Sequence, residues 1–225
     1  RSERMKGWMV AVCCAGLLLC GCGAEEVQAP QSAVPQTEAV RVACVGDSIT
    51  QGFGGHSYVA VLAEANGEAV YGNFGVCGTT ALASGAPSYA DTQAYAESLA
   101  WGADVVVLML GTNDTAYWQG AATFETDLAQ LADAYLDTGA QVLLCTPLAP
   151  DVSMAANDYG VNPAYFADVC DAVHRVAVAR DLPVAEVYAK TEGQPFTLAD
   201  GIHPNQAGAE ALAAVIGSAL KELMA

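Results

Sequence analysis

Along most of the chain, short runs of apolar and β-branched residues alternate with longer segments whose apolar residues recur every three or four positions. The short runs predict buried strands, at residues 39–45, 69–74, 104–110, 141–145 and 183–187. The longer segments predict helices with one buried face, at residues 58–65, 89–99, 124–136, 164–179 and 206–223. Five strands that alternate with helices predict a single α/β domain over residues 39–225, with a parallel sheet between two layers of helices.

The first residues follow a different pattern. Three basic side chains precede an apolar run at residues 8–19, an order that is typical of a secretory signal peptide. The run is too short for a membrane-spanning helix, which needs about 20 apolar residues. It ends in Leu19-Cys20-Gly21-Cys22, which resembles a bacterial lipobox. That resemblance implies a lipoprotein signal peptide over residues 1–21 and lipid attachment at Cys22. The alternative is an ordinary cleaved signal or an uncleaved anchor.

Residues 22–38, which begin with Cys22, contain Pro, Gln, Glu, Ser and Thr and show no apolar periodicity. This composition predicts a flexible, lipid-anchored tether, whose root-mean-square reach is on the order of 20 Å. We therefore expect an exported protein that is held on the extracytoplasmic side of a bacterial membrane.

Composition and charge narrow the classes of partner. The chain has 225 residues, of which 53% are hydrophobic, so it can fill a core and is not intrinsically disordered. It carries 25 acidic residues against 8 basic ones, with a formal charge of −17. Nucleic-acid affinity depends on Lys and Arg contacts to phosphate, so the charge excludes nucleic acid as an expected partner.

Four polar motifs lie after predicted strands or before the last helix, and ligands of open α/β sheets bind at the carboxyl ends of strands. In chain order they are Gly46-Asp47-Ser48-Ile49-Thr50, the turn from Asn73 to Gly78, Gly111-Thr112-Asn113-Asp114, and Asp200-Gly201-Ile202-His203-Pro204. A serine at the start of a helix lies near backbone N–H groups that favour alkoxide character. Asp200 and His203 are three residues apart, so the carboxylate can hold one imidazole nitrogen while the other faces outward as a general base.

With these four motifs in this order, the domain resembles the SGNH hydrolases, the GDSL family of esterases and lipases. The resemblance implies a flavodoxin-like three-layer α/β/α sandwich with a five-stranded parallel sheet in the order 2-1-3-4-5. It implies Ser48 as the nucleophile, His203 as the general base and Asp200 as the carboxylate that orients it. The backbone N–H groups of Ser48 and Gly78 and the side-chain amide of Asn113 would form the oxyanion hole.

The resemblance implies no metal and no organic cofactor. Two departures from the family pattern remove no catalytic group: Ile49-Thr50 replaces the name-giving leucine, and Cys77 stands where serine is frequent. No Cys-x-x-Cys pair occurs among the cysteines after the tether, and the histidines are dispersed, which excludes a zinc site. We expect those four cysteines to be buried thiols: Cys44, Cys77, Cys145 and Cys170. In the implied strand order another strand separates Cys44 from Cys145, so they should not form a disulfide.

Other polar and aromatic residues near the motifs have a structural interpretation beside the functional one. Asp47 is expected to bond loop amides, and His174 to be a surface or hydrogen-bonded helix histidine. His56 is either a solvated loop residue or part of the pocket. Tyr117 and Trp118 either line the pocket as an aromatic wall or serve in packing.

The expected partner is a small-molecule or glycan ester, because an exported esterase encounters glycans, peptidoglycan and lipids. We favour removal of short acyl groups, mainly acetyl, from carbohydrate. Residues 88–92 and 111–118 resemble those of carbohydrate-active members of the family. The alternatives are a lysophospholipase or thioesterase that takes longer acyl chains, and a non-catalytic glycan-binding lipoprotein on the same fold.

Overall fold

The computed structural model describes residues 38–85, 87–153 and 158–225. The predicted signal peptide, Cys22 and nearly all of the tether lie outside these residues. Within the described part of the chain, no helix combines the length and apolar character needed to cross a membrane.

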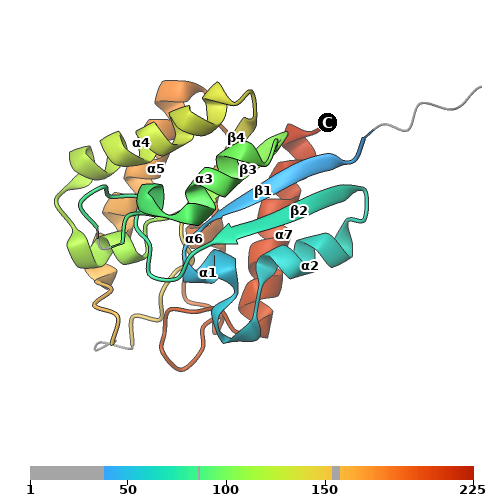
Figure 1. Cartoon of the computed structure of the whole chain (residues 1–225). Helices are drawn as coiled ribbons and strands as arrows, with labels where there is room; N and C mark the ends of the chain where they lie inside the picture. The colour runs from blue at the N-terminus through green and yellow to red at the C-terminus, as the bar shows by residue number, and fades with distance from the viewer. Residues whose placement is uncertain (1–37, 86, 154–157) are drawn as a thin grey trace, which may run out of the picture. The chain divides into compact units, whose positions relative to one another are not determined.

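A five-stranded parallel sheet forms the centre of the domain (Figure 1). Its strands are β1 (Val40–Gly46), β2 (Ala69–Gly75), β3 (Val105–Met109), β4 (Gln141–Cys145) and β5 (Val184–Ala185). Their order is β2-β1-β3-β4-β5, as predicted. Gly46 at the end of β1 pairs with Gly75 of β2 and with Met109 of β3. Three strands therefore end at the same level, and the loops that follow them emerge side by side.

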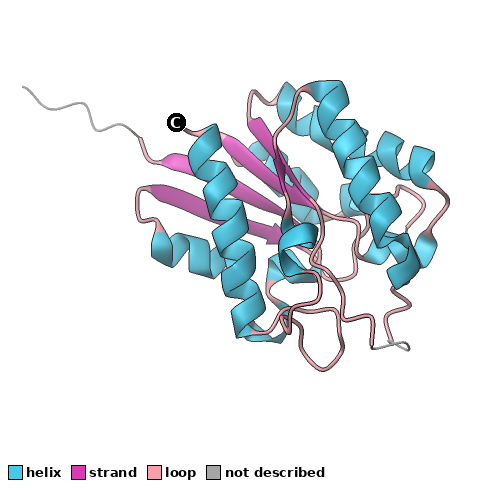
Figure 2. Ribbon diagram, turned by 180° about the vertical axis from the view of Figure 1, so that it is seen from behind, coloured by secondary structure: helices cyan, strands magenta, loops and turns pink. Residues whose placement is uncertain are grey.

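Helices cover both faces of the sheet (Figure 2). The helices are α1 (Ser48–Gln51), α2 (Tyr58–Ala65), α3 (Gln93–Ala100), α4 (Ala121–Asp137), α5 (Phe166–Arg180), α6 (Val187–Thr191) and α7 (Gln206–Leu223). Short 3-10 turns add Phe53–Gly55, Tyr89–Asp91, Asn113–Tyr117 and Pro163–Tyr165. Helices α3, α4 and α5 pack on one face, and α2 and α7 pack on the other (Figure 1).

The hydrophobic core is divided in two by the sheet, because successive side chains of a strand point to opposite faces. In β3, Val106 and Leu108 face α4 and α5, whereas Val105, Val107 and Met109 face α2 and α7. All five β3 residues are buried. The prediction of buried strands in a sheet between two layers of helices is confirmed for β3.

Several predicted elements begin or end a few residues away from the observed ones, and two of these differences have a clear local cause. Residues 89–99 do not form one helix, because Thr92 is extended and its side chain accepts a hydrogen bond from the Tyr95 N–H, which starts α3 after a separate 3-10 turn. The last strand is limited to Val184–Ala185, since α6 begins at Val187 and the Tyr188 N–H is held by Thr146 Oγ1.

The four described cysteines are free. Cys44 and Cys145 are buried, as expected, and burial raises the pKa of the Cys44 thiol to about 12. The expectation was wrong for Cys77, which is exposed, and Cys170 is only half-buried. Cys77 lies in the turn after β2, just before the left-handed Gly78.

Candidate active site

The turn between β1 and α1 presents Ser48 at the carboxyl end of the sheet. Asp47 caps α1 by accepting a 2.9 Å hydrogen bond from the Ile49 N–H. At Gly46 the chain passes so close to the Met109 carbonyl oxygen that a Cβ would lie 2.5 Å from it. This tight turn makes Ser48 the first residue of α1, where a backbone N–H has no acceptor within the helix.

His203 and Asp200 complete a hydrogen-bonded chain with Ser48. The His203 Nε2 atom lies 2.8 Å from Ser48 Oγ, and the Nδ1 atom lies 2.7 Å from Asp200 Oδ2. Ser48 and His203 are 5% and 3% exposed, so the contact between these two side chains is nearly shielded from water. With the Nδ1 proton donated to the carboxylate, Nε2 is the nitrogen that can accept the serine proton.

Asp200 is held as an ionised carboxylate. Its second oxygen, Oδ1, accepts 2.9 Å hydrogen bonds from the N–H groups of Ile202 and His203. Partial burial raises the pKa of Asp200, but the Ile202 N–H, the His203 side chain and the His203 N–H outweigh it and lower the pKa overall. A carboxylate in this state both orients the imidazole and stabilises its protonated form.

Backbone hydrogen bonds fix the loop that carries this pair. The Leu198 N–H donates to the His203 carbonyl oxygen at 2.7 Å, and the Gly201 N–H donates to the Leu198 carbonyl oxygen at 2.9 Å. The Asn205 side chain donates to the Thr197 carbonyl oxygen and accepts from the Gly208 N–H at the start of α7. The imidazole is therefore positioned by a closed loop that is attached to a long helix.

Asn113 lies between the turn that carries Ser48 and the segment that follows Gly78. Its Nδ2 atom donates to the Thr79 carbonyl oxygen at 3.0 Å and lies 3.4 Å from Asp47 Oδ2. Gly78 has φ +78°, which glycine adopts without strain, and it is half-buried. The candidate donors of the oxyanion hole thus come from the ends of three neighbouring strands, β1, β2 and β3.

Asp47 and Asp114 form a buried pair of carboxylates under these donors. Asp114 accepts hydrogen bonds from the N–H groups of Ala81 and Leu82, at 3.2 and 2.8 Å, and so anchors the segment after Gly78. Burial raises the pKa of Asp47 to about 7 and that of Asp114 to about 6. The expectation that Asp47 bonds loop amides is confirmed by its hydrogen bond from the Ile49 N–H. No role was expected for Asp114, although Asp114 directly follows Asn113 in the sequence.

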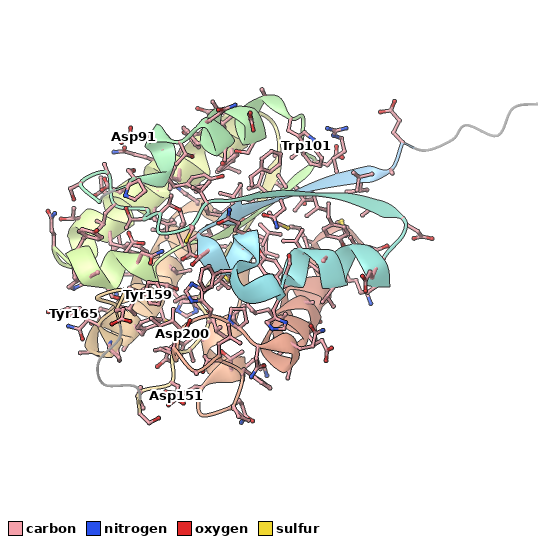
Figure 3. The ribbon with its side chains drawn as sticks, turned by 60° about the horizontal axis from the view of Figure 1, so that its bottom comes forward. Asp91, Trp101, Asp151, Tyr159, Tyr165 and Asp200 are labelled. Atoms are coloured by element: carbon pink, nitrogen blue, oxygen red, sulfur yellow. The ribbon has the colours of Figure 1, made fainter. Side chains whose placement is uncertain are left out.

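Two aromatic rings lie against His203. The Phe53 ring is tilted over the imidazole with a centroid distance of 4.2 Å, and the Tyr159 ring meets it edge-on at 5.2 Å. Figure 3 labels Tyr159 close to Asp200, the carboxylate behind the imidazole. Sequence reasoning named neither ring, because no motif or periodicity marks an aromatic residue in these loops.

The other predicted pocket residues have separate environments. His56 is half-buried, with Nδ1 at 3.3 Å from Gln206 Oε1 of α7. Trp118 stacks on Tyr165 at a centroid distance of 5.6 Å and also packs against Phe124, so packing accounts for its position. Tyr117 is 40% exposed. His174 bonds Glu186 at 2.8 Å, as expected of a hydrogen-bonded helix histidine.

The chemistry available to the site is nucleophilic. A serine, a histidine and a carboxylate in one hydrogen-bonded chain, next to amide donors, can carry out acyl transfer. No group of three or more His, Cys, Asp or Glu side chains in the described ranges is arranged to hold a metal ion.

Most of the chain is similar to known proteins. The sequence pattern of the GDSL-like Lipase/Acylhydrolase family matches residues 44–211. The chain is 32% identical over 217 residues to an acetylxylan esterase of Xylanibacter ruminicola, covering 83% of this chain and 44% of that protein. The chain thus spans less than half the length of this relative.

Solved structures share the fold. A lipase/acylhydrolase from Enterococcus faecalis is 24% identical with a TM-score of 0.67, over 81% of this chain and 96% of that one. An acetylxylan esterase from Geobacillus stearothermophilus, solved as a catalytic mutant, is 20% identical with a TM-score of 0.60, over 80% and 93% of the two chains.

Proposed function

Because this chain belongs to the GDSL-like lipase/acylhydrolase family, whose reaction is the hydrolysis of carboxylic esters, we propose that it removes short acyl groups, chiefly acetyl, from carbohydrate. The reaction proceeds through an acyl-enzyme on Ser48. The observation that carries the proposal is the continuous hydrogen-bonded chain from Ser48 Oγ through His203 to Asp200, with contacts of 2.8 and 2.7 Å.

In the first half of the reaction, His203 Nε2 takes the proton of Ser48 Oγ as the oxygen attacks the acyl carbon. Negative charge develops on the former carbonyl oxygen, which is stabilised by the N–H groups of Ser48 and Gly78 and by the Asn113 amide. The bond to the alcohol oxygen then breaks, and His203 gives its proton to the departing alkoxide.

In the second half, His203 takes a proton from water, and the resulting hydroxide attacks the acyl-Ser48 ester. Collapse of the tetrahedral intermediate releases the carboxylic acid and returns the proton to Ser48 Oγ. Asp200 stays ionised and stabilises the imidazolium in both halves. The overall products are one alcohol and one carboxylic acid.

The acetyl and carbohydrate parts of the proposal rest on two supports. The X. ruminicola relative is an acetylxylan esterase, and it aligns with most of this chain. The chain also carries 25 acidic against 8 basic residues, which disfavours anionic esters by long-range repulsion. A neutral glycan ester meets both conditions.

The test is a series of p-nitrophenyl esters of increasing acyl length, followed by measurement of acetate released from a panel of acetylated polysaccharides. The proposal expects the acetate ester to have the highest kcat/KM and acetylated neutral polysaccharides to release acetate. Faster hydrolysis of long-chain esters would favour the lysophospholipase or thioesterase alternative. The Ser48→Ala variant is the control, and its activity should not exceed the uncatalysed background by more than about 10³–10⁴-fold.

We also propose that the domain works outside the cytoplasm, tethered to a bacterial membrane through a lipid on Cys22. The support is the basic and apolar pattern of residues 1–19 followed by Leu19-Cys20-Gly21-Cys22. In cells that express the full chain, radioactive palmitate should label the protein and should not label the Cys22→Ala variant. Equal labelling of that variant would refute the attachment site.

A further inference from the structure

The rings of Phe53 and Tyr159 flank the imidazole of His203 from two distant parts of the chain. Phe53 opens the 3-10 turn after α1, and Tyr159 precedes the 3-10 turn at Pro163–Tyr165. Their centroids lie 4.2 and 5.2 Å from that of the imidazole. Phe53 is 41% exposed and Tyr159 is 46% exposed, whereas His203 is 3% exposed. The two rings therefore cover the imidazole and present their own surface to solvent.

The chemistry of the leaving group decides which half of the ester meets these rings. His203 Nε2 must give a proton to the alcohol oxygen, so this oxygen has to come within about 2.6–3.2 Å of Nε2. The acyl oxygen faces the opposite side, toward Asn113 and Gly78. The alcohol half of the ester consequently lies against the residues that surround the imidazole, which include Phe53 and Tyr159.

The arginine and lysine side chains in the described part of the chain lie away from these two rings. Arg175 and Arg180 pair with Glu125 and Asp133 on α4, at 2.6 Å each. Arg41, near the opposite end of β1 from Ser48, lies over the ring of Trp101 at 4.1 Å.

The two described lysines, Lys190 and Lys221, line surface grooves beside α7, and neither groove includes Ser48, His203 or the two rings. A phosphate or carboxylate on the alcohol half would therefore find no cation here to offset its desolvation.

We infer that Phe53 and Tyr159 form a stacking site for an uncharged sugar ring in the alcohol half of the ester. The inference rests on the proposed esterase function and names which part of the protein selects its carbohydrate. The C–H face of a pyranose is apolar and packs on exposed aromatic surface, whereas its hydroxyl groups stay in water. Stacking on either side of His203 holds the acetylated oxygen near Nε2.

The test compares Phe53→Ala and Tyr159→Ala with the wild-type protein on two acetate esters. One is a fully acetylated methyl xylopyranoside, which carries the ring, and the other is ethyl acetate, which has none. p-Nitrophenyl esters are avoided because their aromatic leaving group can stack as well. Acetate release is followed enzymatically, and kcat and KM are determined for each pair.

Each variant should lower kcat/KM for the xyloside by roughly 5- to 10-fold, the effect of losing one aromatic contact. For ethyl acetate the change should stay within about twofold, because the Ser48–His203 contact is left in place. Phe53→Trp, which keeps an aromatic face, should restore most of the xyloside activity. Val178→Ala removes an exposed apolar side chain from α5 and should alter neither substrate.

Equal losses on both esters would mean that the rings only hold His203 in place, and this result overturns the inference. Unchanged hydrolysis of the xyloside by both variants also overturns it, while leaving the proposed function intact. If the wild-type protein hydrolyses ethyl acetate but releases no acetate from the sugar, the proposed carbohydrate substrate itself fails, and the stacking site fails with it. A larger loss on ethyl hexanoate than on the xyloside would assign the rings to the acyl chain instead.

Discussion

Replacing Asp200 with Asn tests how Asp200 orients the imidazole of His203, because the substitution keeps the hydrogen bonds that Asp200 makes to the backbone of its loop. In the wild-type protein, Asp200 Oδ2 accepts the Nδ1 proton at 2.7 Å, while Oδ1 accepts from the Ile202 and His203 N–H groups. An asparagine keeps one oxygen for the two backbone donors. Its NH₂ group then faces Nδ1 and donates to it, so the imidazole carries its proton on Nε2 instead.

In that tautomer Nε2 is a donor toward Ser48 Oγ and cannot accept the serine proton. The expected fall in kcat is about 10³–10⁴-fold, or about 4–5.5 kcal/mol of transition-state stabilisation. The free energy of unfolding should change by only about 1 kcal/mol, because the hydrogen bonds to Ile202 and His203 are retained. Asp200→Ala loses these acceptors as well, and it should be less stable than Asp200→Asn by about 1–3 kcal/mol.

The assay is kcat on p-nitrophenyl acetate, with urea denaturation of each variant at the same pH. Asp137→Asn is the matched control: this exposed carboxylate ends α4 just before β4 begins, at the amino end of the strands, whereas Ser48 follows the carboxyl end of β1, so the loss of this carboxylate should not change kcat. If Asp200→Asn retained kcat within tenfold of the wild type, the assigned role of the carboxylate would be refuted.

Three further predictions concern the oxyanion side of the site and the turn beneath it. Asn113→Ala should lower kcat by about 10²–10³ and also cost about 1–3 kcal/mol of stability, because a buried carbonyl oxygen loses its 3.0 Å donor; an unchanged kcat would exclude the amide from the oxyanion hole. Burial raises the pKa of Asp47 to about 7 and of Asp114 to about 6, so the folded state binds more protons than the unfolded chain between about pH 4 and 7. The free energy of unfolding should therefore fall as the pH rises through that window, by up to about 1.4 kcal/mol per unit for each group, and urea denaturation that shows a rise from pH 5 to pH 7 would contradict this. Gly75→Ala should prevent folding or displace α1, since its Cβ would collide with the backbone of α1; Gly67→Ala, where the space is open, is the control, and equal thermal midpoints for the two would refute the collision.

The strands of the sheet could be predicted because a strand that is buried on both faces has apolar residues at successive positions. The main helices could be predicted because their one buried face has apolar residues every three or four positions. The runs at residues 105–109 and 142–145 are apolar throughout, and strands occupy both. The strand order came from the resemblance of four motifs to one family and not from periodicity. The separation of α3 from the preceding 3-10 turn at Thr92 could not be predicted, because it depends on one hydrogen bond from the Tyr95 N–H to the Thr92 side chain.

The side chains of the candidate site could be predicted where they lie in short sequence motifs. Ser48, Asp200, His203 and Asn113 stand in short polar segments after strands or before a helix. The structure joins the side chains of Ser48, His203 and Asp200 by hydrogen bonds, and it places the Asn113 amide 3.4 Å from the carboxylate of Asp47, the residue before Ser48. The rings of Phe53 and Tyr159 could not be found in this way. Their contact with His203 depends on how two loops fold over the sheet, and an isolated aromatic residue in a loop carries no pattern.

The central claim is that Ser48 is the nucleophile of a serine esterase, and covalent labelling tests it most directly. The full chain is treated with a fluorophosphonate probe, digested, and analysed by peptide mass spectrometry. The account predicts one adduct, on the Oγ atom of Ser48, in step with the loss of esterase activity, and none in the Ser48→Ala variant. Labelling that persists in that variant, or an adduct on another residue, would contradict the account.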